Sequence, residues 1–399
     1  MTKHFRISFF FRLLAVLAAV LAVLYFGAVL VIGTHWFHDL LVRRMTQKLE
    51  SETGAVAEMS ELEIEPMIFE VIIRGLTLRN PGPSTEPPLF SSKTLVIRIN
   101  PLSVLRGRLL ISWLDGEGVQ MRIATRPDGS PDFPTSNAER REALRRIVNV
   151  SIRRLVLNGA GFYWNDRKIP LDLSARKVAL LLSHGRGGIY AGSVSASSLN
   201  WKARGIRLPE LVVASRITLS HRSIDLNYLT WRSAAGSGSG EIHLQLAHRL
   251  QGIASLSGQG NLQPLARIFG WKHLRSGSYR IMCSVAYLNG SLAVSGHVQA
   301  DNLLLRNPFF SPGPLNLGSD FSGNADHVKL TNVSAYALGG AFHGVADILF
   351  RNGKPEVKIQ GQVGRVALAQ ALNAVPAAAR LERLFPVYSR INGSVEATW

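Results

Sequence analysis

Residues 241–246, with the sequence EIHLQL, alternate polar and apolar side chains without interruption. Alternation of this kind is typical of a β-strand, because successive side chains of a strand point to opposite faces of its sheet. The same pattern recurs at 94–100, 291–299 and 357–363. The sequence therefore predicts many strands, each with one apolar face and one polar face.

Turn signals separate the alternating runs, in a chain of 399 residues with 36 glycines and 18 prolines. Hairpin-type turns are expected at 158–159, 185–188, 236–238, 289–290 and 352–355. In the body, helices are expected at 137–148, 262–273 and 366–385. The predicted fold class is mostly β: an elongated, curled antiparallel sheet with a groove-like shape and a few short helices.

The N-terminal region contains a candidate transmembrane helix. Residues 13–33 are uncharged and almost wholly apolar, and about 20 such residues match a hydrocarbon core of about 30 Å. A cleaved signal peptide is the alternative, but its apolar region usually has about 7–15 residues. We therefore expect an uncleaved signal-anchor that uses Leu13, Leu17, Leu21, Leu24, Val29, Ile32 and Trp36.

The charges around this span indicate its orientation. Lys3, Arg6 and Arg12 precede it, so the positive-inside tendency places residues 1–12 in the cytoplasm. The body is then expected in the periplasm, and the protein in the cell inner membrane as a single-pass protein.

A helix is expected directly after the span, over residues 34–54. Phe37, Leu41, Met45 and Leu49 recur every four residues, which predicts an amphipathic helix lying at the membrane interface. The remaining chain divides into a β domain at 55–260 and a repeat-like β module at 261–399.

The repeat consists of a strand, a helix and a second strand. It is read once from Asn261 to Tyr279 and again from Val366 to Val395. The second copy reaches Trp399 while its last strand is still beginning. The module is therefore expected to be truncated.

The chemistry of the sequence argues against catalysis. A single cysteine, Cys283, excludes an intramolecular disulfide and a multi-thiolate metal site. No convincing pair of carboxylates and no Ser-His-Asp set is present, and His35 and His38 lack further metal ligands. We expect no enzyme activity, no cofactor and no metal.

The net charge of +18 predicts a polyanionic neighbour. Anionic lipid headgroups and nucleic acid are the two candidates. Because no helix-turn-helix, zinc-finger or RNA-binding signature occurs, we expect membrane lipids, chiefly phospholipid, and no nucleic acid.

The apolar strand faces need a cover, since wet apolar area costs about 25 cal/mol per Å². Too little helix is expected to supply it, so the sheet closes on itself, curls into a trough or holds lipid chains. The candidates for a lipid groove are Leu95, Ile97, Ile99, Leu155, Leu157, Leu180, Leu182, Ile242, Leu244, Leu246, Leu292, Val294, Val357 and Ile359.

An ordered set of motifs carries a family resemblance. The anchor and the helix ending at Gly54 are followed by GLTLRN at 75–80, NPLSVL at 100–105, RPDG at 126–129 and LVLNGA at 155–160. In this order they resemble the AsmA and TamB-like envelope proteins of Gram-negative bacteria, which are bridge-like lipid-transfer proteins. The resemblance is best over residues 1–180, and the chain lacks the family's C-terminal closing region.

The resemblance implies a β-taco groove that carries phospholipid acyl chains between the inner and outer membranes. It also implies a role in outer-membrane biogenesis. The alternative function is an assembly factor that offers a strand edge to an outer-membrane or secreted protein. A membrane-anchored hydrolase is a third hypothesis.

Overall fold

The computed structural model describes residues 34–81, 87–104, 110–125, 152–166, 171–203, 206–220, 222–246, 250–288, 291–324, 326–351, 354–379 and 389–398. The cytoplasmic segment, the span and the helix expected at 1–12, 13–33 and 137–148 lie outside these residues. Within the described ranges, no helix combines the length and the apolar character needed to cross a membrane. Of the expected anchor residues only Trp36 is described, and its side chain is exposed in a helix.

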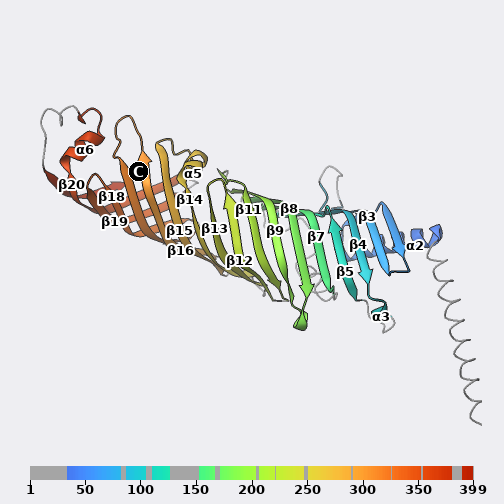
Figure 1. Cartoon of the computed structure of the whole chain (residues 1–399). Coiled ribbons are helices and arrows are strands. Elements are labelled where there is room, and N and C mark those ends of the chain that lie inside the picture. The colour runs from blue at the N-terminus through green and yellow to red at the C-terminus, as the bar shows by residue number, and fades with distance from the viewer. Residues whose placement is uncertain are drawn as a thin grey trace, which may run out of the picture. The chain divides into compact units, whose positions relative to one another are not determined.

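The described residues are mostly β, in one long mixed sheet with a few short helices, which confirms this part of the predicted fold class. Figure 1 labels the helices and strands, and the chain divides into two compact units. Unit 1 comprises Met1–Ile123 and Pro131–Ala160, and unit 2 comprises Ala124–Ser130 and Gly161–Trp399.

Unit 1 is built on a short sheet. Its elements are α2 (His35–Thr53), β1 (Val56–Glu58), β2 (Glu61–Glu65), β3 (Glu70–Arg79), β4 (Phe90–Ile99), α3 (Pro101–Val104), β5 (Ile111–Glu117), β6 (Gln120–Thr125) and the first part of β7 (Arg154–Asp166). The strands β1 and β2 both pair with β3, which pairs with β4, and β4 pairs with β5. β7 pairs with β5 in parallel, so the sheet is mixed rather than purely antiparallel.

The helix expected over 34–54 is present as α2 and is capped at both ends. The hydroxyl oxygen of Thr34 accepts a hydrogen bond from the backbone N–H of Phe37. At the other end Gly54 adopts a left-handed conformation, with φ of 67°, and its N–H donates to the Glu50 carbonyl at 2.7 Å. The Thr53-Gly54 boundary read from the sequence is therefore a true helix end.

The apolar face of α2 packs on the sheet of unit 1. Leu41, Met45 and Leu49 lie against a buried cluster formed by Leu62 and Ile73 together with Leu76. This face is therefore covered by protein, and the position of the helix at a membrane interface stays a prediction.

Unit 2 is a long meander. Its elements are the rest of β7, β8 (Leu171–His184), η1 (Arg186–Gly188), β9 (Tyr190–Ala203), β10 (Ile206–Arg207), β11 (Leu211–Leu219), β12 (Ser223–Ser233), β13 (Gly236–Leu246), β14 (Leu250–Asn261), α5 (Leu262–Phe269), β15 (Leu274–Leu288), β16 (Ser291–Leu305), β17 (Pro314–Gly323), β18 (His327–Ala337), β19 (Gly340–Arg351), β20 (Lys354–Ala367), α6 (Leu368–Ala374) and β21 (Arg390–Thr398). From β11 onward each strand pairs antiparallel with the next, and β9 pairs with β8, β10 and β11.

Two predicted turns are wrong, because glycine serves another purpose there. Residues 158–159 lie inside β7, where Gly159 has a φ of 64° within the strand. Residues 236–238 begin β13, and the turn instead lies at Ala234 and Ala235. The turn at 185–188 is confirmed, and it contains the short helix η1.

The helix expected over 366–385 is shorter than predicted among the described residues. β20 continues through Ala367, and α6 ends at Ala374. Pro376 explains this end, because a proline disfavours helical backbone at the residue before it. The helix expected over 262–273 is present as α5, which is capped by Asn261 but already ends at Phe269, where Gly270 adopts the left-handed conformation with φ of 69°.

Four described strands of unit 2 contain a β-bulge that is marked by a residue with a positive φ angle. Tyr228, Asn302, Asn332 and Arg365 have φ angles of 53°, 53°, 52° and 60°, and each lies where the register of its strand shifts. Because a bulge bends its strand and increases the local twist, these residues curve the sheet. The strands concerned, β12, β16, β18 and β20, all run in the same direction.

Two buried serines support two of these bulges. The hydroxyl of Ser215 donates to the Asn227 carbonyl at 3.0 Å, and the hydroxyl of Ser319 donates to the Thr331 carbonyl at 3.0 Å. Each carbonyl belongs to the residue before the positive φ angle. The same serine-to-carbonyl hydrogen bond therefore stabilises the bulge at β11–β12 and the bulge at β17–β18.

Candidate functional site

The apolar face of unit 2 is the candidate site, and strand register decides which residues share it. One row of directly opposed residues crosses β8, β9 and β11–β20. It consists of Leu182, Gly192, Ile217, Leu226, Ile242, Ala254, Val285, Val294, Gly323, Val328, Ile348 and Val357. Four groove candidates, Leu182, Ile242, Val294 and Val357, are thus brought into one continuous row.

Two parallel rows contain further candidates on the same face. The first contains Tyr190, Leu219, Ile224, Leu244, Gly252, Tyr287 and Leu292. The second contains Leu229, Gly240, Leu256, Cys283, Gly296, Phe321, Leu330, Ala346 and Ile359. Leu180 lies two residues from Leu182 and pairs with Val194, while Leu246 pairs with Leu250.

These side chains are covered to different extents. Ile242, Leu244 and Val294 are half-buried and Leu292 is exposed, while the buried members of the rows are Leu182, Tyr190, Leu229 and Ala346. Among the described residues, the cluster of fully buried and mutually packed apolar side chains lies in unit 1. Among the residues that the structure describes, no helix layer like that of α2 covers the apolar rows of unit 2.

The candidates in unit 1 have a different environment. Leu95 and Ile97 pack against the buried cluster beneath α2. Ile99 pairs with Ile111 in β5. In β7, Leu155 and Leu157 pair with residues of β5. Leu95 and Ile97 are thus core residues of unit 1.

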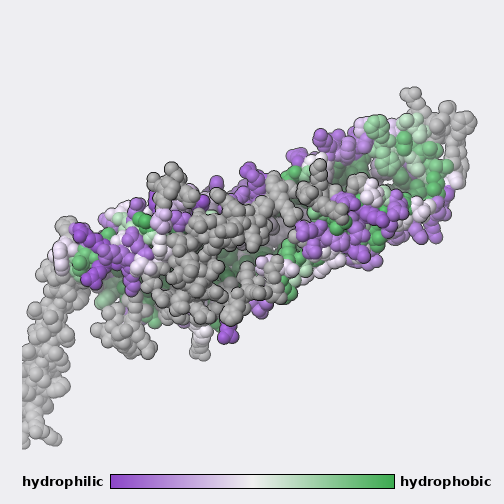
Figure 2. All heavy atoms as spheres, turned by 180° about the vertical axis from the view of Figure 1, so that it is seen from behind, coloured by the Kyte–Doolittle hydropathy of each residue, from purple (hydrophilic) through white to green (hydrophobic). Residues whose placement is uncertain are grey.

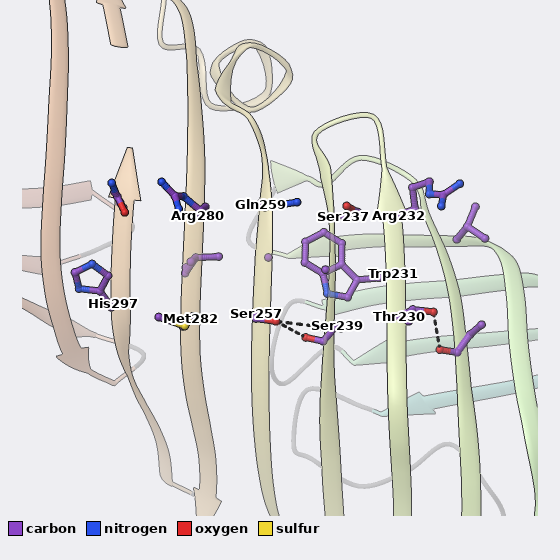
Figure 3. A pocket seen from close by; sticks show the side chains of 16 residues that line it. Thr230, Trp231, Arg232, Ser237, Ser239, Ser257, Gln259, Arg280, Met282 and His297 are labelled. Atoms are coloured by element: carbon purple, nitrogen blue, oxygen red, sulfur yellow. Dashed lines mark hydrogen bonds between the residues drawn. The ribbon is translucent and has the colours of Figure 1, made fainter. Parts of the chain in front are cut away.

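Trp231 explains Gly238, which the sequence pattern assigned to a turn, and also Gly258 in β14. A Cβ at Gly238 would lie 2.2 Å from Cζ2 of Trp231, and a Cβ at Gly258 would lie 2.6 Å from the same atom. The indole therefore lies across β13 and β14, in the space that two side chains would otherwise fill (Figure 3). Repeated glycine beside a tryptophan was the signal for this packing.

The polar face of unit 2 is hollowed, which sequence reasoning missed. A hollow of about 820 Å³ extends from β11 to β16 and includes Arg232, Gln259, Arg280 and His297 (Figure 3). An overlapping hollow of about 800 Å³ continues to β18. Serines line the two hollows. Ser237 lies in the first, Ser239 and Ser257 lie in both, and the second also contains Ser255, Ser284, Ser295 and Ser322.

Hydrogen bonds and ion pairs organise the acidic groups on this face. Asp320 lies 2.8 Å from Nδ1 of His297 and accepts a hydrogen bond from Nδ2 of Asn332 at 2.8 Å. Hydrogen bonding from Asn332, then from His297, lowers the pKa of the Asp320 carboxyl. Arg280 pairs with Asp301 at 3.2 Å.

The arrangement offers apolar area on one face and hydroxyl, amide and guanidinium groups on the other. Cys283 lies in an apolar row, where burial raises the pKa of its thiol above the usual range. Within the described ranges, no group of three or more His, Cys, Asp or Glu residues is placed to hold a metal ion. No family model, curated protein or solved structure matches the chain.

Proposed function

We propose that this chain is an inner-membrane-anchored, periplasmic protein of the AsmA/TamB type that moves phospholipid between the inner and outer membranes and supports outer-membrane biogenesis. The acyl chains lie on the curled apolar face of unit 2. The observation that carries the proposal is the continuous row of opposed residues from Leu182 to Val357, in which the apolar side chains after the buried Leu182 are partly covered.

The length of this row favours a path over a pocket. At a strand spacing of about 4.8 Å, a row across β8, β9 and β11–β20 follows the sheet for about 50 Å. One leaflet of a bilayer core is about 15 Å thick, half of about 30 Å, so the row exceeds the length of one acyl chain severalfold.

The energetics favour an apolar occupant. Each square ångström of apolar surface that leaves water contributes about 25 cal/mol. The half-buried rows retain such surface, and an acyl chain lying on them would cover it. Figure 2 shows hydrophilic residues beside the apolar ones of unit 2, where headgroups would remain in water.

The test is photocrosslinking from single positions of the full chain in a bacterial envelope. A photocrosslinker at Ile242 or Leu244 is expected to form phospholipid adducts. The matched control is His243, which lies between them on the opposite face and is exposed. A second control is Ile97, which packs under α2.

The outcome separates the competing functions. Lipid adducts at Ile242 and Leu244, absent at His243 and Ile97, support the conduit. Adducts to protein chains alone would replace it with the strand-edge assembly factor. Equal lipid labelling at Ile242 and His243 would show that the apolar rows do not select lipid.

A further inference from the structure

Three segments of unit 2 meet at one edge of its sheet. They are residues 262–275, which contain α5, residues 305–314, and residues 368–379, which contain α6. These segments lie at the ends of β14, β16 and β20. These three strands run in the same direction, so they end at the same edge, where Figure 1 shows both helices. We call this surface the helical edge.

Backbone hydrogen bonds join the segments to one another. The N–H of Arg306 donates to the His273 carbonyl at 2.8 Å. The N–H of Ser311 donates to the Ala374 carbonyl at 2.7 Å. The loop 306–313 is therefore fixed between the other two segments, and the helical edge is continuous.

The helical edge exposes four large aromatic side chains. Phe309 is 80% exposed and Trp271 is 49% exposed, and Phe269 and Phe310 are exposed as well. The rings of Phe269 and Trp271 stack with centroids 5.2 Å apart. Grouped exposed aromatics of this kind are typical of an interaction surface, and tryptophan favours the headgroup level of a membrane.

The charge of the helical edge has a single sign. Residues 262–275, 305–314 and 368–379 contain Arg267, Lys272, Arg275 and Arg306 and no aspartate or glutamate. All four cations are exposed. These cations therefore attract an anionic surface, and no carboxylate of these segments repels it.

An apolar recess lies next to the aromatic pair. This hollow of about 600 Å³ is lined by Leu262, Trp271, Leu274 and Leu303, among others. Figure 2 shows apolar residues gathered at the end of unit 2 that carries α6. The helical edge thus combines apolar area, aromatic rings and cations, the combination that binds a bilayer surface.

We propose that the helical edge docks on the surface of an anionic lipid bilayer. Trp271, Phe309 and Phe310 lie at headgroup level, and the four cations lie against lipid phosphates. Charge complementarity selects this partner over a zwitterionic membrane. The proposal does not depend on lipid movement along the apolar rows.

The experiment measures capture of labelled vesicles by the full chain held in phosphatidylcholine nanodiscs. Vesicles of phosphatidylcholine with phosphatidylglycerol are expected to be captured, and vesicles of phosphatidylcholine alone are not. Replacing Lys272→Gln and Arg306→Gln together is expected to weaken capture about 25-fold, at about fivefold per charge. Phe309→Ser with Phe310→Ser is also expected to weaken it.

The matched control is Ile253→Ser with Met282→Ser, which removes exposed apolar side chains of unit 2 from mid-strand positions. This variant is expected to retain capture. Equal capture of both vesicle types, or equal loss in the control, would overturn the proposal. Binding of an acidic protein without vesicles would identify a protein partner instead.

Lipid crosslinking at Ile242 in the same nanodiscs reports separately on the proposed conduit. If vesicle capture fails while crosslinking is retained, only the docking proposal fails. If crosslinking fails while vesicle capture is retained, only the conduit proposal fails. A circular dichroism melt of each variant confirms that it has folded.

Discussion

Ser319→Ala tests whether the buried hydroxyl holds the bulge in β18. The side chain is 1% exposed, and its hydroxyl donates to the carbonyls of Thr331 at 3.0 Å and Asp320 at 2.9 Å. The hydroxyl has one hydrogen, so the two bonds share it. Alanine removes that donor and leaves the backbone path unchanged.

The expected cost follows from this geometry. Loss of one shared hydrogen bond to buried carbonyl groups costs about 1–2 kcal/mol of unfolding free energy. For a unit of this size, each kcal/mol lowers Tm by about 2–4 °C, so Tm is expected to fall by about 2–8 °C.

The assay is thermal unfolding followed by circular dichroism, with Ser322→Ala as the control on the same strand. Ser322 is exposed, and its replacement is expected to leave Tm nearly unchanged. An unchanged Tm in Ser319→Ala, or an equal decrease in both variants, would refute the role of this hydroxyl in the bulge.

Three further predictions concern packing and pH. Gly238→Ala is expected to lower the unfolding free energy by about 1–3 kcal/mol, measured by urea denaturation, because its Cβ would lie 2.2 Å from the Trp231 ring. The control is Gly393→Ala, which is expected to be neutral because no atom lies within 4 Å of the added Cβ. Met45→Ala is expected to cost about 1–3 kcal/mol of unit 1 stability, measured by the same method, because it opens a gap beneath α2. The folded-state pKa of Asp320 is lowered, so its stabilisation is present above about pH 3.9 and is lost as the pH falls through the folded-state pKa. Urea midpoints across this pH range are expected to fall less steeply in Asp320→Asn than in the unchanged chain.

Local sequence patterns predicted the elements well where one physical signal dominated. Alternation identified β4, β13, β16 and β20, because a strand with one covered face must alternate. Gly54 marked the end of α2, since glycine readily adopts the left-handed conformation found there.

Prediction failed where one residue type serves two purposes. The glycines at 236 and 238 suit a turn. They also suit close packing in the sheet, Gly236 against the backbone of β14 and Gly238 beneath Trp231, which no local pattern reveals. Alternation likewise placed Leu95 and Ile242 on apolar faces. It did not reveal that α2 covers Leu95, whereas none of the helices in the described part of the chain forms such a layer over the row that contains Ile242.

The strands of unit 2 make their backbone hydrogen bonds mainly with the strands next to them in the sequence. From β11 onward every strand is hydrogen-bonded to its sequence neighbours. Stability in such an array is close to a sum over adjacent pairs, as in repeat proteins. Inserting or deleting one hairpin then changes the width of the sheet, measured across its strands, by about 10 Å, and it leaves distant strands intact. Evolution can thus adjust the length of this chain in small steps.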